Sequence, residues 1–197
     1  MANTAKFDRQ EVLGKATRLF WRKGFHATST RDIQQATSLR PGSIYAAFGS
    51  KSGLFKEVLA FYAQNGAETL RQCIEGEKTI LGGLQAFFRY TLLGGNKDAP
   101  NELCLLVKSL SELDEGEPEL LSETRSLLVA VENRFRNYLE AAVSAGELPA
   151  TTDTSALARQ LQVKLIGLRS YLRASSDRKA VERMIDNLFE MPLVQSH

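Results

Sequence analysis

The sequence predicts an all-α protein with a small N-terminal group of three helices and a larger C-terminal helical bundle. Two observations carry this prediction. Apolar residues recur at helical spacing along most of the 197 residues, whereas sustained alternation of apolar and polar residues, the pattern of strands, does not occur. Glycine-containing turns separate the periodic segments, which is typical of successive helices joined by short links.

The first two helices are marked by capping residues. Asp8 is expected to cap a helix over residues 8–23 that Gly24 ends, because aspartate accepts bonds from free helical amides and glycine tolerates the backbone of a helix end. Hydroxyl side chains at 28–30 offer a cap to a short second helix over residues 31–36.

A third short helix and a long fourth helix follow. Pro41 fits the first position of a helix over residues 41–48, since a proline there loses no hydrogen bond. Gly49 ends this helix, and the next helix is expected over residues 51–75.

Two short helices joined by a tight link, between two longer helices, make a helix-turn-helix arrangement. A recognition helix can be short because only its first residues enter the major groove of DNA. Pro41 and Gly42 leave little side-chain bulk at its tip, while Ile44 and Phe48 are expected to anchor it in the core. We therefore expect residues 1–50 to form a helix-turn-helix DNA-binding domain.

The distribution of charge agrees with this expectation. The formal net charge is only +2, yet residues 1–60 carry ten lysines and arginines against four acidic residues, and the rest of the chain carries 15 against 19. A compact basic segment is a candidate for contacting a polyanion, whereas an acidic partner domain stays off it.

Several function classes lack support in the sequence. The two histidines, His26 and His197, lie far from the cysteines, and no phosphate-binding loop, dinucleotide fingerprint or HExxH motif occurs, so we expect no enzyme, no cofactor and no metal site. His26 is expected to be a loop histidine. Cys73 and Cys104 are expected to be reduced thiols. No apolar stretch approaches the length of a membrane span, so we expect a cytoplasmic protein without membrane contact.

The run GFHATSTRDIQQATSLRPGSIYAAFGSKSGLF resembles the N-terminal domain of TetR-family transcriptional repressors. It matches their GF, TxxxI, GxxYxxF and KxxL elements at the expected spacing. The resemblance implies a homodimer on a palindromic double-stranded operator and a C-terminal domain, residues 51–197, that dimerises and binds a small-molecule effector.

The resemblance also implies DNA-contacting residues. Thr30 and Tyr45 match phosphate contacts, Lys51 matches a backbone clamp, and Arg40, Gly42 and Ser43 match positions at or near base edges. Pro41 and Ala46 complete the outward face of the recognition helix. For Arg31 a phosphate contact and a solvated helix charge are equally open. The expected set is Thr30, Arg31, Arg40, Pro41, Gly42, Ser43, Tyr45, Ala46 and Lys51.

The C-terminal part is expected to hold five further helices, over residues 78–93, 100–113, 118–145, 153–173 and 178–189. Apolar stripes, from Leu121 to Ala142 and from Leu157 to Leu172, recur at alternating three- and four-residue spacing. Such stripes bury against other helices. They serve either a four-helix interface between two subunits or the core of one subunit.

The segment NELCLLVKSLSEL resembles the NemR-like subgroup of this family, whose members sense electrophiles through a cysteine in a matching position. Cys104 is that cysteine here, and Lys108 matches the lysine that follows. A nearby cation or a helix N-terminus activates a thiol, and Cys104 is expected in the first turns of its helix. The alternative is that Cys104 is a buried apolar residue.

A ligand cavity between the bundle helices is the other candidate site. Its expected lining consists of Phe87, Phe88, Tyr90, Val107 and Tyr171 together with Cys104 and Lys108. Each aromatic side chain is equally a candidate for the core. Two other readings remain: a repressor with a non-covalent ligand and no redox role, and an architectural DNA-binding protein without an effector.

Overall fold

In the computed structural model the described residues are 7–94 and 103–190, and within these two ranges every regular element is helical. The chain divides into two compact units: Met1–Gln64 with Leu105–Leu127, and Asn65–Cys104 with Leu128–His197. Two long helices, α4 (Lys51–Gly76) and α7 (Pro118–Ser144), contribute to both units. In the described ranges no helix combines the length and the hydrophobicity needed to cross a bilayer.

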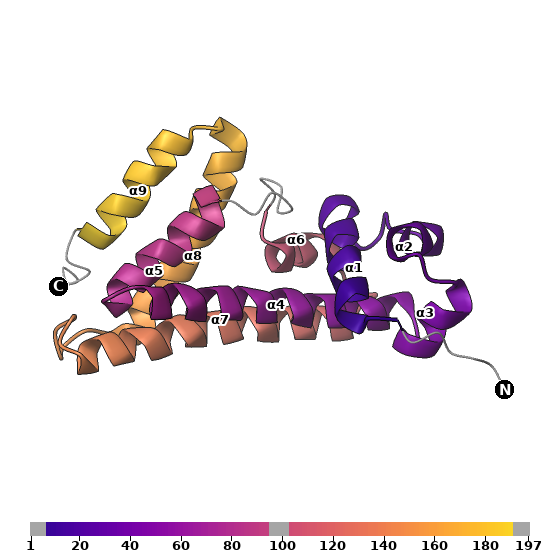
Figure 1. Cartoon of the computed structure of the whole chain (residues 1–197), viewed down its shortest axis with the longest axis horizontal. Coiled ribbons are helices and arrows are strands. Elements are labelled where there is room, and N and C mark those ends of the chain that lie inside the picture. Colours follow the sequence, from indigo (N-terminus) through magenta and orange to yellow (C-terminus); the bar gives the residue numbers. More distant parts are fainter. Residues whose placement is uncertain (1–6, 95–102, 191–197) are drawn as a thin grey trace. The chain divides into compact units, whose positions relative to one another are not determined.

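The first unit gathers the N-terminal helices around the first half of α4 (Figure 1). Its other helices are α1 (Arg9–Lys23), α2 (Thr30–Thr37), α3 (Pro41–Phe48) and α6 (Leu105–Glu112). The core is aromatic: the ring centroids of Phe20 and Phe25 lie 4.8 and 4.9 Å from that of Phe55. Trp21 packs edge-on against Tyr62 of α4.

The caps predicted for α1 and α2 are confirmed. Asp8 accepts hydrogen bonds from the amides of Gln10 and Glu11. Ser29 is the hydroxyl residue that caps α2, and it forms a reciprocal capping box with Asp32. The Lys23 ammonium, followed by the donors of Ser29, holds the pKa of Asp32 well below its usual range.

The recognition helix α3 also has its predicted form. Pro41 occupies its first turn, and Gly49, at φ +73°, ends it. Ile44 and Phe48 are buried and fix which face of this short helix turns inward. The side chain of Ser50 then accepts the amide of Gly53 at 2.9 Å, which caps α4.

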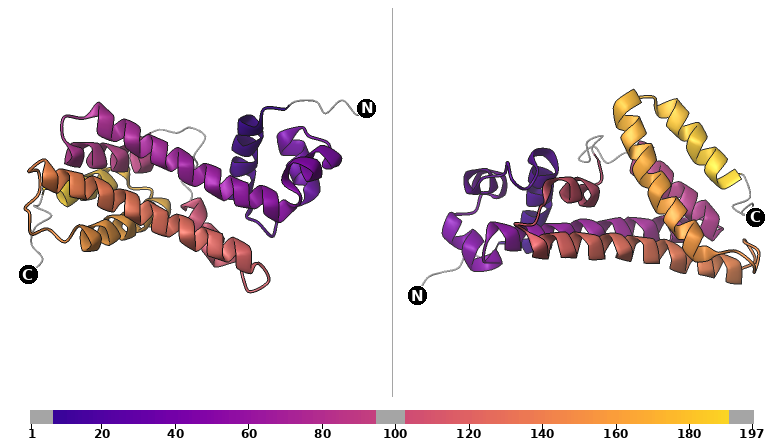
Figure 2. Two further views of the ribbon diagram at one scale, coloured as in Figure 1. Left: turned by 90° about the horizontal axis from the view of Figure 1, so that it is seen from below. Right: turned by 180° about the vertical axis from the view of Figure 1, so that it is seen from behind.

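The second unit packs α5 (Ile80–Arg89), the π-helical segment η1 (Tyr90–Gly94), α8 (Thr154–Ser175) and α9 (Arg178–Glu190) with the later halves of α4 and α7. Its ribbon is seen from two further sides in Figure 2. Phe88, Phe135, Leu161 and Ile185 are fully enclosed in its core. Figure 1 also shows α9 turning back toward α5.

Some predicted boundaries differ from the structure. The 78–93 helix begins at Ile80, because the hydroxyl of Thr79 caps the amide of Gly82 at 3.0 Å. The 100–113 helix begins at Leu105, whose burial with Leu106 fixes α6 in the core. Cys104 therefore precedes the helix instead of lying in its first turns, and residues 100–102 lie outside the described residues.

The two apolar stripes serve the core of the chain itself at most of their positions. Phe135 and Ala142 in α7 and Leu157, Leu161 and Leu172 in α8 are buried within the second unit. These five side chains therefore pack against their own chain.

Candidate DNA-binding interface

The outward face of α2 and α3 presents a paired set of hydroxyl groups. The hydroxyl of Tyr45 in α3 lies 3.2 Å from that of Thr30 in α2, so the two side chains form a hydrogen bond. Tyr45 is nevertheless 46% exposed. An exposed phenol held by a neighbour presents its oxygen in a fixed place, which suits contact with a phosphate.

The N-terminal end of α3 is exposed to solvent. Arg40, Pro41, Gly42 and Ala46 are exposed, and Ser43 is half-buried. A Cβ added at Gly42 would meet no atom of the described residues within 4 Å, so packing among these residues does not require a glycine there. Arg31 is exposed at the start of α2. Eight of the nine predicted DNA-contacting residues thus lie on or beside α2 and α3, and the ninth begins α4.

The ninth residue, Lys51, is held differently from the others. Its Nζ lies 4.4 Å from the ring centroid of Phe25, a cation–π contact. Burial lowers the pKa of the Lys51 ammonium, and the negative charge of Glu117 partly offsets this.

Side chains of α6 form hydrogen bonds with the end of α1 and with the link between α1 and α2. Lys108 of α6 donates to the carbonyl oxygens of Trp21 at 2.6 Å and of Arg22 at 3.2 Å, the last turn of α1. A cation at the C-terminal end of a helix satisfies free carbonyls and interacts favourably with the helix dipole. The end of α1, just before the helix-turn-helix, is therefore bonded to a side chain more than 80 residues away in the sequence.

Glu112 of α6 contacts the link between α1 and α2 as well. Its carboxylate accepts the amide of Phe25 at 2.7 Å, and its carbonyl lies 3.0 Å from the Nε2 atom of His26. Gly24, at φ +84°, makes the turn that brings these groups to α6. Glu112 is not among the residues predicted from the sequence, because its spacing of four from Lys108 is that of an ordinary surface ion pair.

The residues predicted to sense or bind an effector belong to both units. Phe87 and Phe88 are buried and pack against the ring of Phe135 at 6.0 and 6.3 Å between centroids. Tyr90 and Tyr171 are exposed. Val107 and Lys108 belong to the first unit, whereas these four aromatic residues belong to the second.

The two thiols differ in setting. Cys73 and Cys104 are both half-buried and are not joined in a disulfide. Burial, followed by the negative charge of Glu77, raises the pKa of the Cys73 thiol and makes it a poor nucleophile at neutral pH. Cys104 directly precedes α6, the helix that fastens the link between α1 and α2.

Comparison with known proteins assigns both parts of the chain. Residues 12–58 match the family model described as "Bacterial regulatory proteins, tetR family", and residues 81–188 match that described as "Tetracyclin repressor-like, C-terminal domain". The HTH-type transcriptional repressor ComR of Escherichia coli (strain K12) is 29% identical over 164 residues, which are 82% of this chain and 78% of ComR.

Solved structures agree. A cysteine mutant of the TetR family transcriptional regulator CifR, solved with 26 bp double-strand operator DNA, has a TM-score of 0.82 and 26% identity over 94% of this chain and 97% of its own. A TetR family regulator from Cytophaga hutchinsonii has a TM-score of 0.81 at 20% identity, covering 92% of this chain and 91% of that one. None of these relatives is an enzyme by its description. The helix-turn-helix, the C-terminal helical bundle and both family matches establish the chain as a DNA-binding transcriptional regulator of the TetR family.

Proposed function

We propose that this regulator is a homodimeric repressor that binds a palindromic operator through α3 of each subunit and leaves it when a small molecule acts on the C-terminal domain. The observation that carries the proposal is the exposed face of α2 and α3, where Thr30 positions the hydroxyl of Tyr45. Two such faces on a dimer would reach half-sites about 34–36 Å apart.

Gly42 gives independent support for close contact with DNA. Apart from its chain neighbours and the backbone of its own helix, no atom of residues 7–94 or 103–190 lies within 4 Å of the place where a Cβ at position 42 would be. The absence of a side chain is then explained by a partner whose surface comes close to the backbone, which is the approach of a recognition helix to the major groove.

Arg40 and Ser43 are the candidates for reading bases. Arg40 is exposed at the N-cap position of α3, and a guanidinium reads guanine through two parallel hydrogen bonds. Ser43 follows one turn into the helix. Tyr45 and Thr30 are the candidates for phosphate, which sets register without reading sequence.

Tyr45→Phe tests the interface directly. Fluorescence anisotropy on DNA from the upstream region of the protein's own gene should show a loss of about tenfold in affinity, because one hydrogen bond to a charged oxygen disappears. Tyr90→Phe removes the same hydroxyl from an exposed tyrosine of the second unit and should leave affinity unchanged. Equal affinity of Tyr45→Phe and the unaltered protein would remove Tyr45 from the interface.

The same titration separates a specific repressor from an architectural DNA-binding protein. A specific repressor prefers its operator over a scrambled duplex by roughly a thousandfold or more at physiological salt. An architectural protein binds both equally, and its affinity falls with salt on any sequence.

Cys104 is the proposed sensing residue, supported by its place immediately before α6. A reactive quinone should release the unaltered protein from operator, whereas Cys104→Ser should stay bound. Cys73→Ser is the matched control and should respond like the unaltered protein, because the pKa of Cys73 is raised by burial. Release of Cys104→Ser by the quinone, or release by an inert apolar compound, would favour a non-covalent ligand instead.

A further inference from the structure

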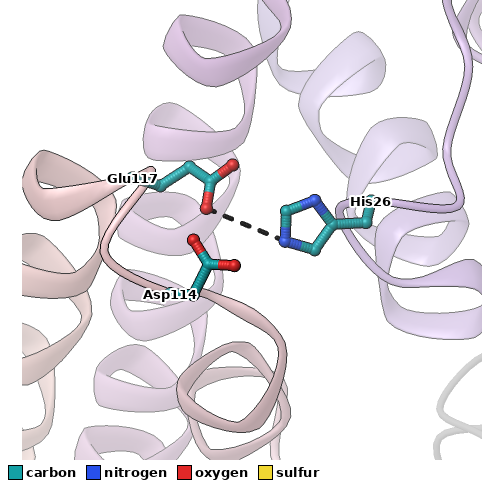
Figure 3. A group of neighbouring side chains, drawn as sticks. All are labelled: His26, Asp114 and Glu117. Atoms are coloured by element: carbon teal, nitrogen blue, oxygen red, sulfur yellow. Dashed lines mark ion pairs between the residues drawn. The ribbon is translucent and has the colours of Figure 1, made fainter.

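Three side chains that could bind a metal ion lie close together beside the link between α1 and α2. His26 lies in the link between α1 and α2, and Asp114 and Glu117 lie in the link between α6 and α7 (Figure 3). One ligand atom from each residue lies within 4.8 Å of the other two. All three residues belong to the first unit.

One of these ligand atoms is a buried carboxylate oxygen. The Oε2 atom of Glu117 has almost no solvent-exposed area and no hydrogen-bond partner within residues 7–94 and 103–190. The Nε2 atom of His26 lies 3.7 Å from this oxygen, within ion-pair distance but too far for a hydrogen bond. A buried carboxylate oxygen without a partner is costly, so this atom points to a missing donor or cation.

The backbone around the acidic pair is already ordered by local bonds. The carboxylate of Asp114 accepts the amide of Gly116 at 2.7 Å, and its carbonyl accepts the amide of Glu117 at 3.1 Å. The turn therefore holds both carboxylates close together before any ion arrives. Such preorganisation reduces the ordering that binding requires.

We propose that His26, Asp114 and Glu117 bind a divalent transition-metal cation of the Zn²⁺ type. Ligand atoms about 2.1 Å from one tetrahedral ion lie about 3.4 Å apart, close to the 3.7 Å between His26 and Glu117. An imidazole with two carboxylates favours zinc-like ions over Mg²⁺ and Ca²⁺, which prefer oxygen ligands alone.

Binding changes one existing contact. The Nε2 atom of His26 lies 3.0 Å from the carbonyl oxygen of Glu112, which can only accept a hydrogen bond, so Nε2 carries the ring proton in this contact. On metal binding this hydrogen bond breaks, the proton moves to Nδ1, and the lone pair of Nε2 turns to the ion. Three protein ligands leave a fourth position for water. The cation thereby ties the α1–α2 link to the α6–α7 link.

Zinc binding tests the site without DNA. Purified full-length protein should take up one Zn²⁺ per chain in competition with a chromophoric chelator. Glu117→Gln and His26→Gln should each weaken this binding by more than about tenfold, because each removes a ligand. Glu115→Gln makes the same charge change in the same turn, outside the ligand set, and should bind like the unaltered protein.

Two results would overturn the site. One is unchanged zinc affinity in both ligand variants, which would assign uptake to the cysteines or another group, since those variants keep both thiols. The other is a loss of zinc affinity in Glu115→Gln as large as that in the ligand variants, which would show that only the total negative charge of the turn matters. Circular dichroism on each variant shows whether it is folded. Glu117→Gln and Glu115→Gln each remove one carboxylate and keep His26, so comparing their zinc affinities does not depend on the histidine variant.

Discussion

At the scale of single residues, Lys108 has a structural importance that its sequence position conceals. Its ammonium donates to two carbonyl oxygens of the last turn of α1. These oxygens are among those that a helix leaves without intrahelical partners. The side chain is only 22% exposed, so solvent replaces it poorly.

Lys108→Met should therefore destabilise the protein by about 1–2 kcal/mol in urea unfolding, from the loss of two charge-assisted bonds to a partly buried helix end. Lys56→Met is the control. Lys56 makes an exposed 3.6 Å ion pair with Glu123, which contributes about 0–1 kcal/mol. Equal losses in the two variants would show that the contacts of Lys108 with α1 contribute nothing beyond a surface charge.

At the scale of elements, α4 and α5 approach each other through Gly83. A Cβ at this position would lie 2.5 Å from the Cα atom of Ile74, in the backbone of α4. Real Cβ atoms do not come so close, so an alanine would push the two helices apart. Gly83 is thus a packing residue, although in sequence the pair Gly82 and Gly83 reads as a break between helices.

Gly83→Ala should destabilise the protein by about 1–3 kcal/mol, the usual range for overpacking a tight contact. Gly66→Ala is the matched control within α4. A Cβ there meets nothing within 4 Å, so alanine should be neutral or stabilise by about 0.4–1 kcal/mol. Thermal unfolding of both variants measures the difference, and a stable Gly83→Ala protein would mean that the α4–α5 contact gives way easily.

The sequence predicted the elements of the first unit more closely than its contacts. Capping residues and Pro41 placed α1 to α3 within a residue or two, because these signals are local. The roles of Lys108 and Glu112 depend on groups 86–87 residues away, and no local pattern predicts such a partner. The paired hydroxyls of Thr30 and Tyr45 were each predicted, but their mutual bond was not.

At the scale of the whole molecule, the proposed dimer needs an apolar surface that one chain leaves uncovered. Val129 of α7 is 57% exposed and Val163 of α8 is 69% exposed. The side chain of Gln162 in α8 donates to the carbonyl oxygen of Leu128 in α7 at 3.0 Å, so the two helices lie close together near these valines. Exposed valines on these two helices are the apolar side chains that a second copy of the chain would cover in the proposed dimer.

Val163→Glu should convert the dimer to a monomer, because two carboxylates would be buried against each other at a two-fold interface. Analytical ultracentrifugation measures the mass. Met184→Glu is the control, since Met184 is 40% exposed on α9 and belongs to no such patch in this proposal. A dimeric Val163→Glu protein would place the interface elsewhere.

The fastening of the α1–α2 link by α6 has a consequence for protein engineering. Regulators of this kind invite chimeras, in which one protein's DNA-reading part is joined to another's ligand-responsive part. A junction at residue 50 separates Trp21 and Phe25 from Lys108 and Glu112, whose side chains form hydrogen bonds with their backbone groups. A transferable cassette from this chain therefore consists of two pieces, residues 7–64 and residues 105–127, which have to be exchanged together.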